Sequence, residues 1–81
     1  MFYTYILFSK IADKYYIGQT SNITERLQKH QNKNKGFTNK AKDWVIVYQK
    51  DFQTRSQAVA HEKQIKNWKS RKMILKLIEA Q

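Results

Sequence analysis

The chain has 81 residues, and sixteen lysines and arginines against six aspartates and glutamates give it a net charge of +10. This length predicts one domain with a modest core, and the absence of cysteine excludes disulfides and thiolate zinc sites. So much positive charge indicates a polyanionic partner, for which we favour nucleic acid over an acidic membrane surface because no segment combines an apolar helix face with a basic one over the needed length.

Two aromatic and β-branched runs at the start of the chain predict a hairpin. Residues 2–8 carry apolar side chains at both parities, which is typical of a central strand covered on both faces. Residues 14–19 are expected to return antiparallel to them, after a polar turn centred near residues 10–11. This hairpin would place Tyr5 and Tyr16 roughly opposite each other on one face.

Gly18 stands near the end of the second predicted strand. A glycine there weakens the strand and lets another backbone or a phosphate approach closely. A simple bulge or strand exit explains it equally well, and both interpretations stay open.

A first helix is predicted after residues 21–22, a serine and an asparagine that are both good N-caps. Ile23 and Leu27 are spaced to pack on the sheet. Arg26 and His30 also lie four residues apart, on a flank of that stripe, so their side chains are neighbours on one side of the helix.

The segment that follows, residues 32–42, is predicted to be a basic loop. A solvated loop is the simplest interpretation, but the density of lysine favours an arm that follows a phosphate backbone, with Phe37 available for stacking. The cations assigned to this arm are Lys33, Lys35, Lys40 and Lys42.

The second half of the chain predicts one more strand and two more helices. Residues 44–50 form the most apolar run, which indicates a strand. Thr54 and Gln57 make a capping box that opens a helix reaching about residue 68. Ser70 caps a last short helix, whose expected inward side chains are Met73, Ile74, Leu77 and Ile78. The predicted fold class is therefore α/β, a three-stranded antiparallel sheet flanked by helices in the order ββαβαα.

Glu62 interrupts the apolar face of the longer helix, between Ala58 and Ile65. A carboxylate on a packed face is costly unless it is paired or binds a cation. Two interpretations follow: Glu62 pairs with Lys66 one turn later, or it holds a metal ion. We set His61 aside as a zinc ligand, because adjacent residues of a helix point in different directions.

Together these residues resemble the GIY-YIG nuclease superfamily, and most closely its small stand-alone bacterial members. Residues 3–5, Tyr-Thr-Tyr, stand where the first motif would be and lack its glycine, whereas residues 16–18, Tyr-Ile-Gly, repeat the second motif. Three later positions match the family arginine, a position usually held by histidine or tyrosine, and the metal-binding glutamate; they are Arg26, His30 and Glu62.

The resemblance implies a single-domain endonuclease over the whole chain that hydrolyses phosphodiester bonds in DNA. One Mg²⁺ or Mn²⁺ would bind Glu62, since Mg²⁺ often takes only one or two carboxylates. Arg26 would stabilise the transition state, and Tyr5, Tyr16 and His30 would share the proton handling. Whether Tyr16 or His30 is the general base stays open, because a phenol needs help to lose its proton near neutral pH and a histidine does not.

The resemblance also shapes the expected setting of the protein. Without an attached DNA-binding domain, DNA would be held by the loop lysines and Lys66, or a protein partner would direct the chain to its target. DNA repair or processing, with selectivity for DNA structure, is the expected role, and RNA stays open as a substrate. A cytoplasmic location is expected, since the N-terminus lacks the pattern of a signal peptide. The alternative function is a nucleic-acid-binding module that keeps the fold with little or no activity.

Overall fold

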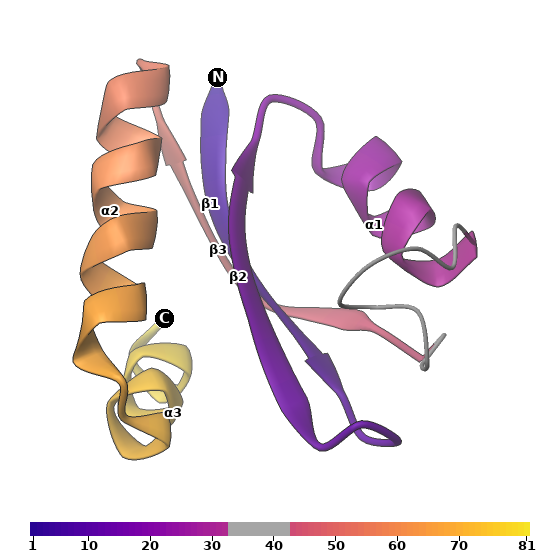
Figure 1. Ribbon diagram of the computed structural model, residues 1–81. Helices are drawn as coiled ribbons and strands as arrows, with labels where there is room; N and C mark the ends of the chain where they lie inside the picture. The colour runs from indigo at the N-terminus through magenta and orange to yellow at the C-terminus, as the bar shows by residue number, and fades with distance from the viewer. Residues whose placement is uncertain (33–42) are drawn as a thin grey trace.

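The computed structural model describes residues 1–32 and 43–81, apart from the side chains of residues 30–32. Its element order confirms the predicted ββαβαα arrangement (Figure 1). The elements are β1 (Phe2–Ser9), β2 (Lys14–Thr20), α1 (Ile23–Asn32), β3 (Val45–Phe52), α2 (Arg55–Trp68) and α3 (Arg71–Ala80).

The three strands form one antiparallel sheet in the order β2-β1-β3, so β1 is the central strand, as its pattern predicts. Figure 1 shows α1 against one face of the sheet, and α2 and α3 against the other. On the α1 face the buried core is Tyr5, Leu7 and Trp44. On the opposite face it is Ile6, Tyr48 and Ile65, which explains why β1 is apolar at both parities.

The hairpin register differs from the prediction. Tyr5 pairs with Gly18, and Tyr16 pairs with Leu7, so the two tyrosines are diagonal neighbours rather than opposite each other. The last strand pair is Ser9 with Lys14, which makes the turn four residues long and centres it one residue later than predicted. The observed partner of Tyr5, Gly18, lies two residues beyond the predicted partner, Tyr16. Because side chains alternate between the two faces with period two, both tyrosines still lie on the α1 face.

The turn is held by side-chain hydrogen bonds that local patterns do not reveal. The Ser9 hydroxyl donates to Asp43 Oδ1 at 2.6 Å and accepts from the Ala12 N–H at 3.0 Å. The Ile11 N–H donates to Asp43 Oδ2 at 3.0 Å. The hydrogen bonds that Asp43 accepts from Ser9 and Ile11 hold the pKa of its carboxyl below its usual range. Asp43 therefore ties the turn to the residues that lead into β3.

Gly18 has a packing role that neither interpretation of the sequence anticipates. A Cβ at this position would lie 2.6 Å from the Tyr5 hydroxyl oxygen and 2.8 Å from the Tyr5 ring carbon that bears it. The β1–β2 ladder runs without a register shift, so Gly18 is not at a bulge. The ring of Tyr5 fills the space that a side chain would need.

The helix starts confirm the predicted caps. The Asn22 side chain accepts from the Glu25 N–H at 3.0 Å, so Asn22 caps α1, and Thr54 with Gln57 forms the full capping box of α2. Ser70 caps α3. The inward assignment of Met73 was wrong, because its side chain is 42% exposed and the packed side of α3 begins at residue 74. Within the described residues, no helix is long and apolar enough to cross a membrane.

Candidate active site

The predicted catalytic residues come from four different elements: Tyr5 from β1, Tyr16 from β2, Arg26 from α1 and Glu62 from α2. The pKa of the Tyr5 hydroxyl indicates which of the other three act on it. Burial raises the pKa of the Tyr5 hydroxyl well above its ordinary value, Tyr16 and Glu62 raise it further, and Arg26 lowers it. All three groups therefore lie within electrostatic range of the Tyr5 hydroxyl, and the ring of Tyr16 lies beside that of Tyr5.

Tyr5 and Tyr16 differ in exposure. Tyr5 is 2% exposed, whereas Tyr16 is half-buried, and their rings stack at an angle of 30° with centroids 6.4 Å apart. Since its pKa is raised, Tyr5 keeps its proton at neutral pH and can act as a hydrogen-bond donor but not as a base. Of the two phenols, Tyr16 is the one accessible to a substrate.

Arg26 is the exposed residue among the four candidates. Helix α1 packs on the sheet through Ile23 and Leu27, which contact the core on the Tyr5 face. Arg26 lies between these two positions and is exposed. Its planar guanidinium can therefore offer two parallel donors to a phosphate without first leaving a buried position.

Glu62 lies at the edge of the packed face of α2. Its side chain is 17% exposed, while Ala58 and Ile65 on the same face are fully buried. Lys66 Nζ donates to Glu62 Oε2 at 2.6 Å, and the lysine is 52% exposed. The predicted pair between these residues is thus present, and a flexible lysine offsets the cost of a largely buried carboxylate.

The donor set near Glu62 suits a hard cation that needs few protein ligands. Over the described residues there is no group of three or more histidines, cysteines, aspartates or glutamates that could hold a metal ion. His61 is instead hydrogen-bonded to the Tyr48 hydroxyl at 3.0 Å and lies against the Phe52 ring. A single carboxylate fits Mg²⁺ or Mn²⁺, which take the remaining ligands from water and phosphate oxygens.

Comparison with known proteins agrees with this geometry. The model of the GIY-YIG catalytic domain matches residues 1–74. The chain belongs to the GIY-YIG family. A UPF0213 protein of Staphylococcus haemolyticus (strain JCSC1435) is 38% identical to it over 79 residues, which cover 95% of this chain and 93% of that protein. No solved structure matches the chain significantly. Membership of the GIY-YIG family makes this a nuclease-type domain with nucleic acid as its substrate.

Some predicted residues of this GIY-YIG chain cannot be placed. His30 belongs to α1, but its side chain lies outside the described residues. The same is true of the whole basic loop, so the nucleic-acid contacts assigned there stay predictions; they are Lys33, Lys35, Lys40 and Lys42.

Sequence reasoning also missed residues that shape this GIY-YIG site. Asp43 secures the hairpin turn and directly precedes Trp44, which packs against Tyr5. Gly18 makes room for the Tyr5 ring. Gly18 already stood out as the last residue of the second motif, but nothing in the spacing of Asp43 connects it to Ser9, 34 residues earlier.

Proposed function

We propose that this chain is a divalent-metal-dependent endonuclease that hydrolyses phosphodiester bonds in DNA. The observation that carries the proposal is that a phenol, a guanidinium and a carboxylate, from three other elements, all lie within electrostatic range of the buried Tyr5 hydroxyl. Phosphodiester hydrolysis needs a proton acceptor, a cation for the phosphate charge and a means of holding the reacting groups in line. The cluster supplies groups suited to each need.

Proton handling falls to the tyrosines and His30. Tyr16 is accessible, so its hydroxyl can take part in removing a proton from the attacking water. His30 is the alternative base, because an imidazole titrates close to neutral pH. Tyr5 stays protonated, so its part in the site is limited to that of a hydrogen-bond donor.

Arg26 and Glu62 act on the phosphate charge. The guanidinium of Arg26 binds two non-bridging oxygens and stabilises the negative charge that develops during attack. Glu62 would hold Mg²⁺ or Mn²⁺, which supplies charge neutralisation at the phosphate when bound. Lys66 must release Glu62 for this, and its exposed position allows it to turn towards the substrate instead.

We extend the proposal to the setting of the reaction. The net charge of +10 supports binding through many phosphate contacts and little base reading, which favours selectivity for DNA structure over DNA sequence. We propose that residues 1–81 act as one domain in the cytoplasm, in DNA repair or processing, and that a protein partner directs the chain to its target. RNA is the competing substrate.

One observation favours a second function, a nucleic-acid-binding module without catalysis. Lys66 already satisfies Glu62 at 2.6 Å, so the carboxylate has a structural partner without any metal ion. In that case the basic surface would hold nucleic acid and the cluster around Tyr5 would only stabilise the fold.

Cleavage assays separate the two functions. Pure protein is incubated with single-stranded, duplex, flapped and branched DNA and with matched RNAs, in Mg²⁺, Mn²⁺ or EDTA. The nuclease predicts cuts in at least one DNA, dependent on the metal and lost in EDTA. Binding without cleavage of any substrate would support the module and contradict the nuclease.

A further inference from the structure

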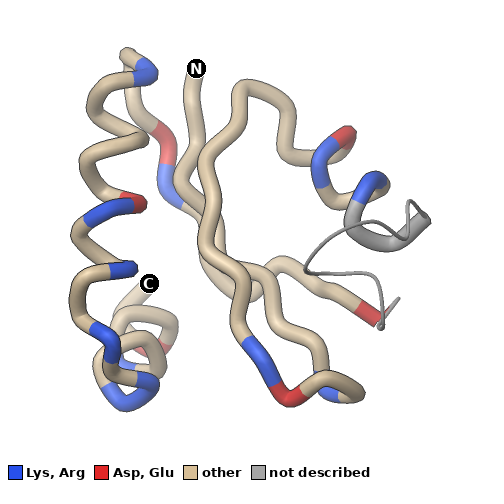
Figure 2. Tube along the Cα trace, viewed as in Figure 1, with Lys and Arg blue, Asp and Glu red and all other residues tan. Residues whose placement is uncertain are grey.

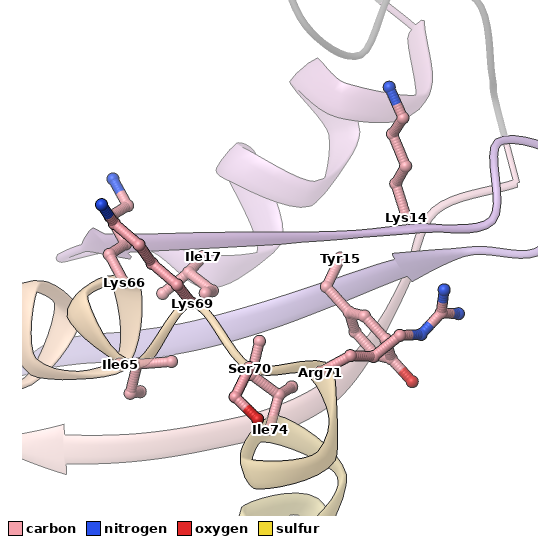
Figure 3. A pocket seen from close by; sticks show the side chains of 9 residues that line it. All are labelled: Lys14, Tyr15, Ile17, Ile65, Lys66, Lys69, Ser70, Arg71 and Ile74. Atoms are coloured by element: carbon pink, nitrogen blue, oxygen red, sulfur yellow. The ribbon is translucent and has the colours of Figure 1, made fainter.

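A groove of about 330 Å³ lies between β2 and the junction of α2 with α3 (Figure 3). Its apolar walls come from β2 and both helices, and they include Tyr15, Ile17, Ile65 and Ile74. Its remaining lining is mostly cationic: Lys14, Lys66, Lys69 and Arg71. These four side chains come from β2, the end of α2, the two-residue link between the helices and the start of α3.

The groove is positively charged even after its ion pairs are counted. Among the residues that the structure describes, no aspartate or glutamate lines it. Arg71 is paired with Asp13 at 2.7 Å, and Lys66 with Glu62 at 2.6 Å, so the two acids offset only part of the charge of the four cations. Figure 2 shows basic residues concentrated at the same junction of α2 and α3.

The cationic groups point away from the apolar walls. In Figure 3 the Nζ atoms of Lys14, Lys66 and Lys69 all point to one side of the groove. Lys14 precedes Tyr16 by two residues on β2, so both side chains lie on the same face of the sheet. Lys66 follows Glu62 by one helical turn, a rise of about 6 Å. The basic rim therefore continues directly from the candidate active site.

Helix dipoles explain only part of this cation set, because Lys66 and Lys69 stand at the C-terminal end of α2, where positive charge is favoured, whereas Arg71 stands at the start of α3. Lys69 ends α2 in the left-handed conformation with φ 48°, a position that glycine or asparagine usually fills. Arg71 and Lys72 occupy the first turn of α3, where the helix dipole disfavours positive charge; the turn itself holds no acidic residue, and Asp13 from the hairpin turn offsets Arg71 alone. An anionic ligand at the groove would remove this unfavourable charge concentration.

We propose that the groove binds the sugar–phosphate backbone of the nucleic-acid strand that flanks the bond being cut. Its position beside the cut rests on the proposed nuclease function, whereas its affinity for nucleic acid does not. The contact uses other cations than those assigned to the segment between α1 and β3, and the bound strand would run from the active site across the edge of β2 towards α3.

The test compares two variants that remove equal charge. The groove variant combines Lys14→Gln, Lys69→Asn and Arg71→Gln; asparagine tolerates the left-handed backbone at position 69, and Lys66 is kept because it contacts Glu62. The control variant changes three exposed lysines outside the groove, Lys50→Gln, Lys63→Gln and Lys76→Gln. DNA affinity is measured over a range of salt concentrations without divalent metal, so that cleavage does not contribute.

Counterion release gives the expected result. Each lost phosphate contact lowers the slope of log affinity against log salt by about 0.7–0.9, so the groove variant should lose about 2–3 in slope and the control less than about 1. Equal slopes for the two variants would overturn the proposal. The groove variant also loses the Arg71–Asp13 pair, which can lower its melting temperature. If it does not stay folded, Lys69→Asn alone is measured, and its slope of log affinity against log salt should fall by about 0.7–0.9. An unchanged slope in Lys69→Asn would contradict the proposal.

A crosslinking experiment locates the DNA directly. The chain has no cysteine, so Lys69→Cys and Lys76→Cys each accept a single benzophenone maleimide. Irradiation with bound DNA should crosslink the probe at position 69 and not at position 76, and equal yields would contradict the proposal. If the wild type cuts nothing but the labelled Lys69→Cys variant crosslinks, the groove is retained and the nuclease function is removed. Cleavage with equal crosslinking at both positions would do the reverse.

Discussion

Lys66 Nζ donates a hydrogen bond of 2.6 Å to Glu62 Oε2, so the carboxylate that we assign to the metal already has a cationic partner. The carboxylate is 17% exposed and the lysine 52% exposed. The exposed lysine can turn into solvent, but the carboxylate that it leaves is poorly solvated, so its departure requires another cation in its place. If the chain is a nuclease, a metal ion replaces Lys66 at Glu62 during the reaction. If it is a binding module, the pair between Lys66 and Glu62 persists.

Removing the lysine should strengthen metal binding. In Lys66→Met the competing charge is gone and the stem of the side chain is kept, so the affinity of the free protein for Mn²⁺ should rise by up to about fivefold, the effect of a screened ion pair. Titration calorimetry or Mn²⁺ resonance spectra would measure it, with Lys63→Met on the same helix as the control. An affinity that stays equal in both variants would show that the pair does not compete with the metal.

Tyr16→Phe removes one accessible hydroxyl and keeps the ring. Cleavage should fall by about 10²–10⁴-fold if that hydroxyl handles a proton, while the free energy of unfolding changes by about 1 kcal/mol. Tyr48→Phe, which removes a hydroxyl on the opposite side of the sheet, should leave cleavage unchanged. Normal cleavage by Tyr16→Phe would move the role of base to His30.

Gly18→Ala should destabilise the protein through Tyr5. The added Cβ would lie 2.6 Å from the Tyr5 hydroxyl oxygen, and such overpacking costs about 1–3 kcal/mol. Combining it with Tyr5→Leu removes the clash, so a double-mutant cycle in urea should show strong coupling. Additive effects of the two changes would mean that the glycine serves some other purpose.

The lowered pKa of His61 predicts that the folded protein becomes mildly less stable at acid pH. Burial lowers the pKa of its imidazole, with a further lowering from Lys50, although the hydrogen bond to Gln64 opposes both. A base whose pKa is lower in the folded state gives stability that is present above its unfolded value of about 6.5 and is lost as the pH falls through the folded value. The melting temperature of the wild type should therefore fall more steeply between about pH 7.5 and about pH 5 than that of His61→Gln. Parallel curves would contradict this role.

Local signals predicted the elements well, because caps depend on neighbours in the sequence. Thr54 with Gln57 and Ser70 could each be assigned from three or four consecutive residues. The hairpin register could not, since it depends on Asp43, which is distant in sequence from Ser9. The fold class and the family followed from the pattern as a whole.

The candidate site was predictable only in part for the same reason. The motif spacing indicated Tyr5, Tyr16, Arg26 and Glu62, and the fold places the last three within electrostatic range of Tyr5. The cations at Lys14, Lys69 and Arg71 come from three segments, so only the tertiary structure shows that they line one groove. The roles of the site residues, and the contacts of the loop lysines, remain predictions.

The most direct test of the nuclease account is Glu62→Gln. Glutamine keeps the shape of the side chain and lowers its desolvation cost, so the variant should stay folded. Its DNA affinity should hold or rise, because a negative charge near the phosphates has gone. Glu25→Gln, which removes an exposed carboxylate paired with Lys29 on α1, is the matched control and should cleave like the wild type.

Cleavage of DNA in Mn²⁺ and in EDTA by the wild type and both variants decides the matter. The account predicts metal-dependent cleavage by the wild type and the control, with a loss of about 100-fold or more in Glu62→Gln. Wild-type cleavage that persists in EDTA, or a Glu62→Gln variant that cuts as fast as the wild type, would contradict it.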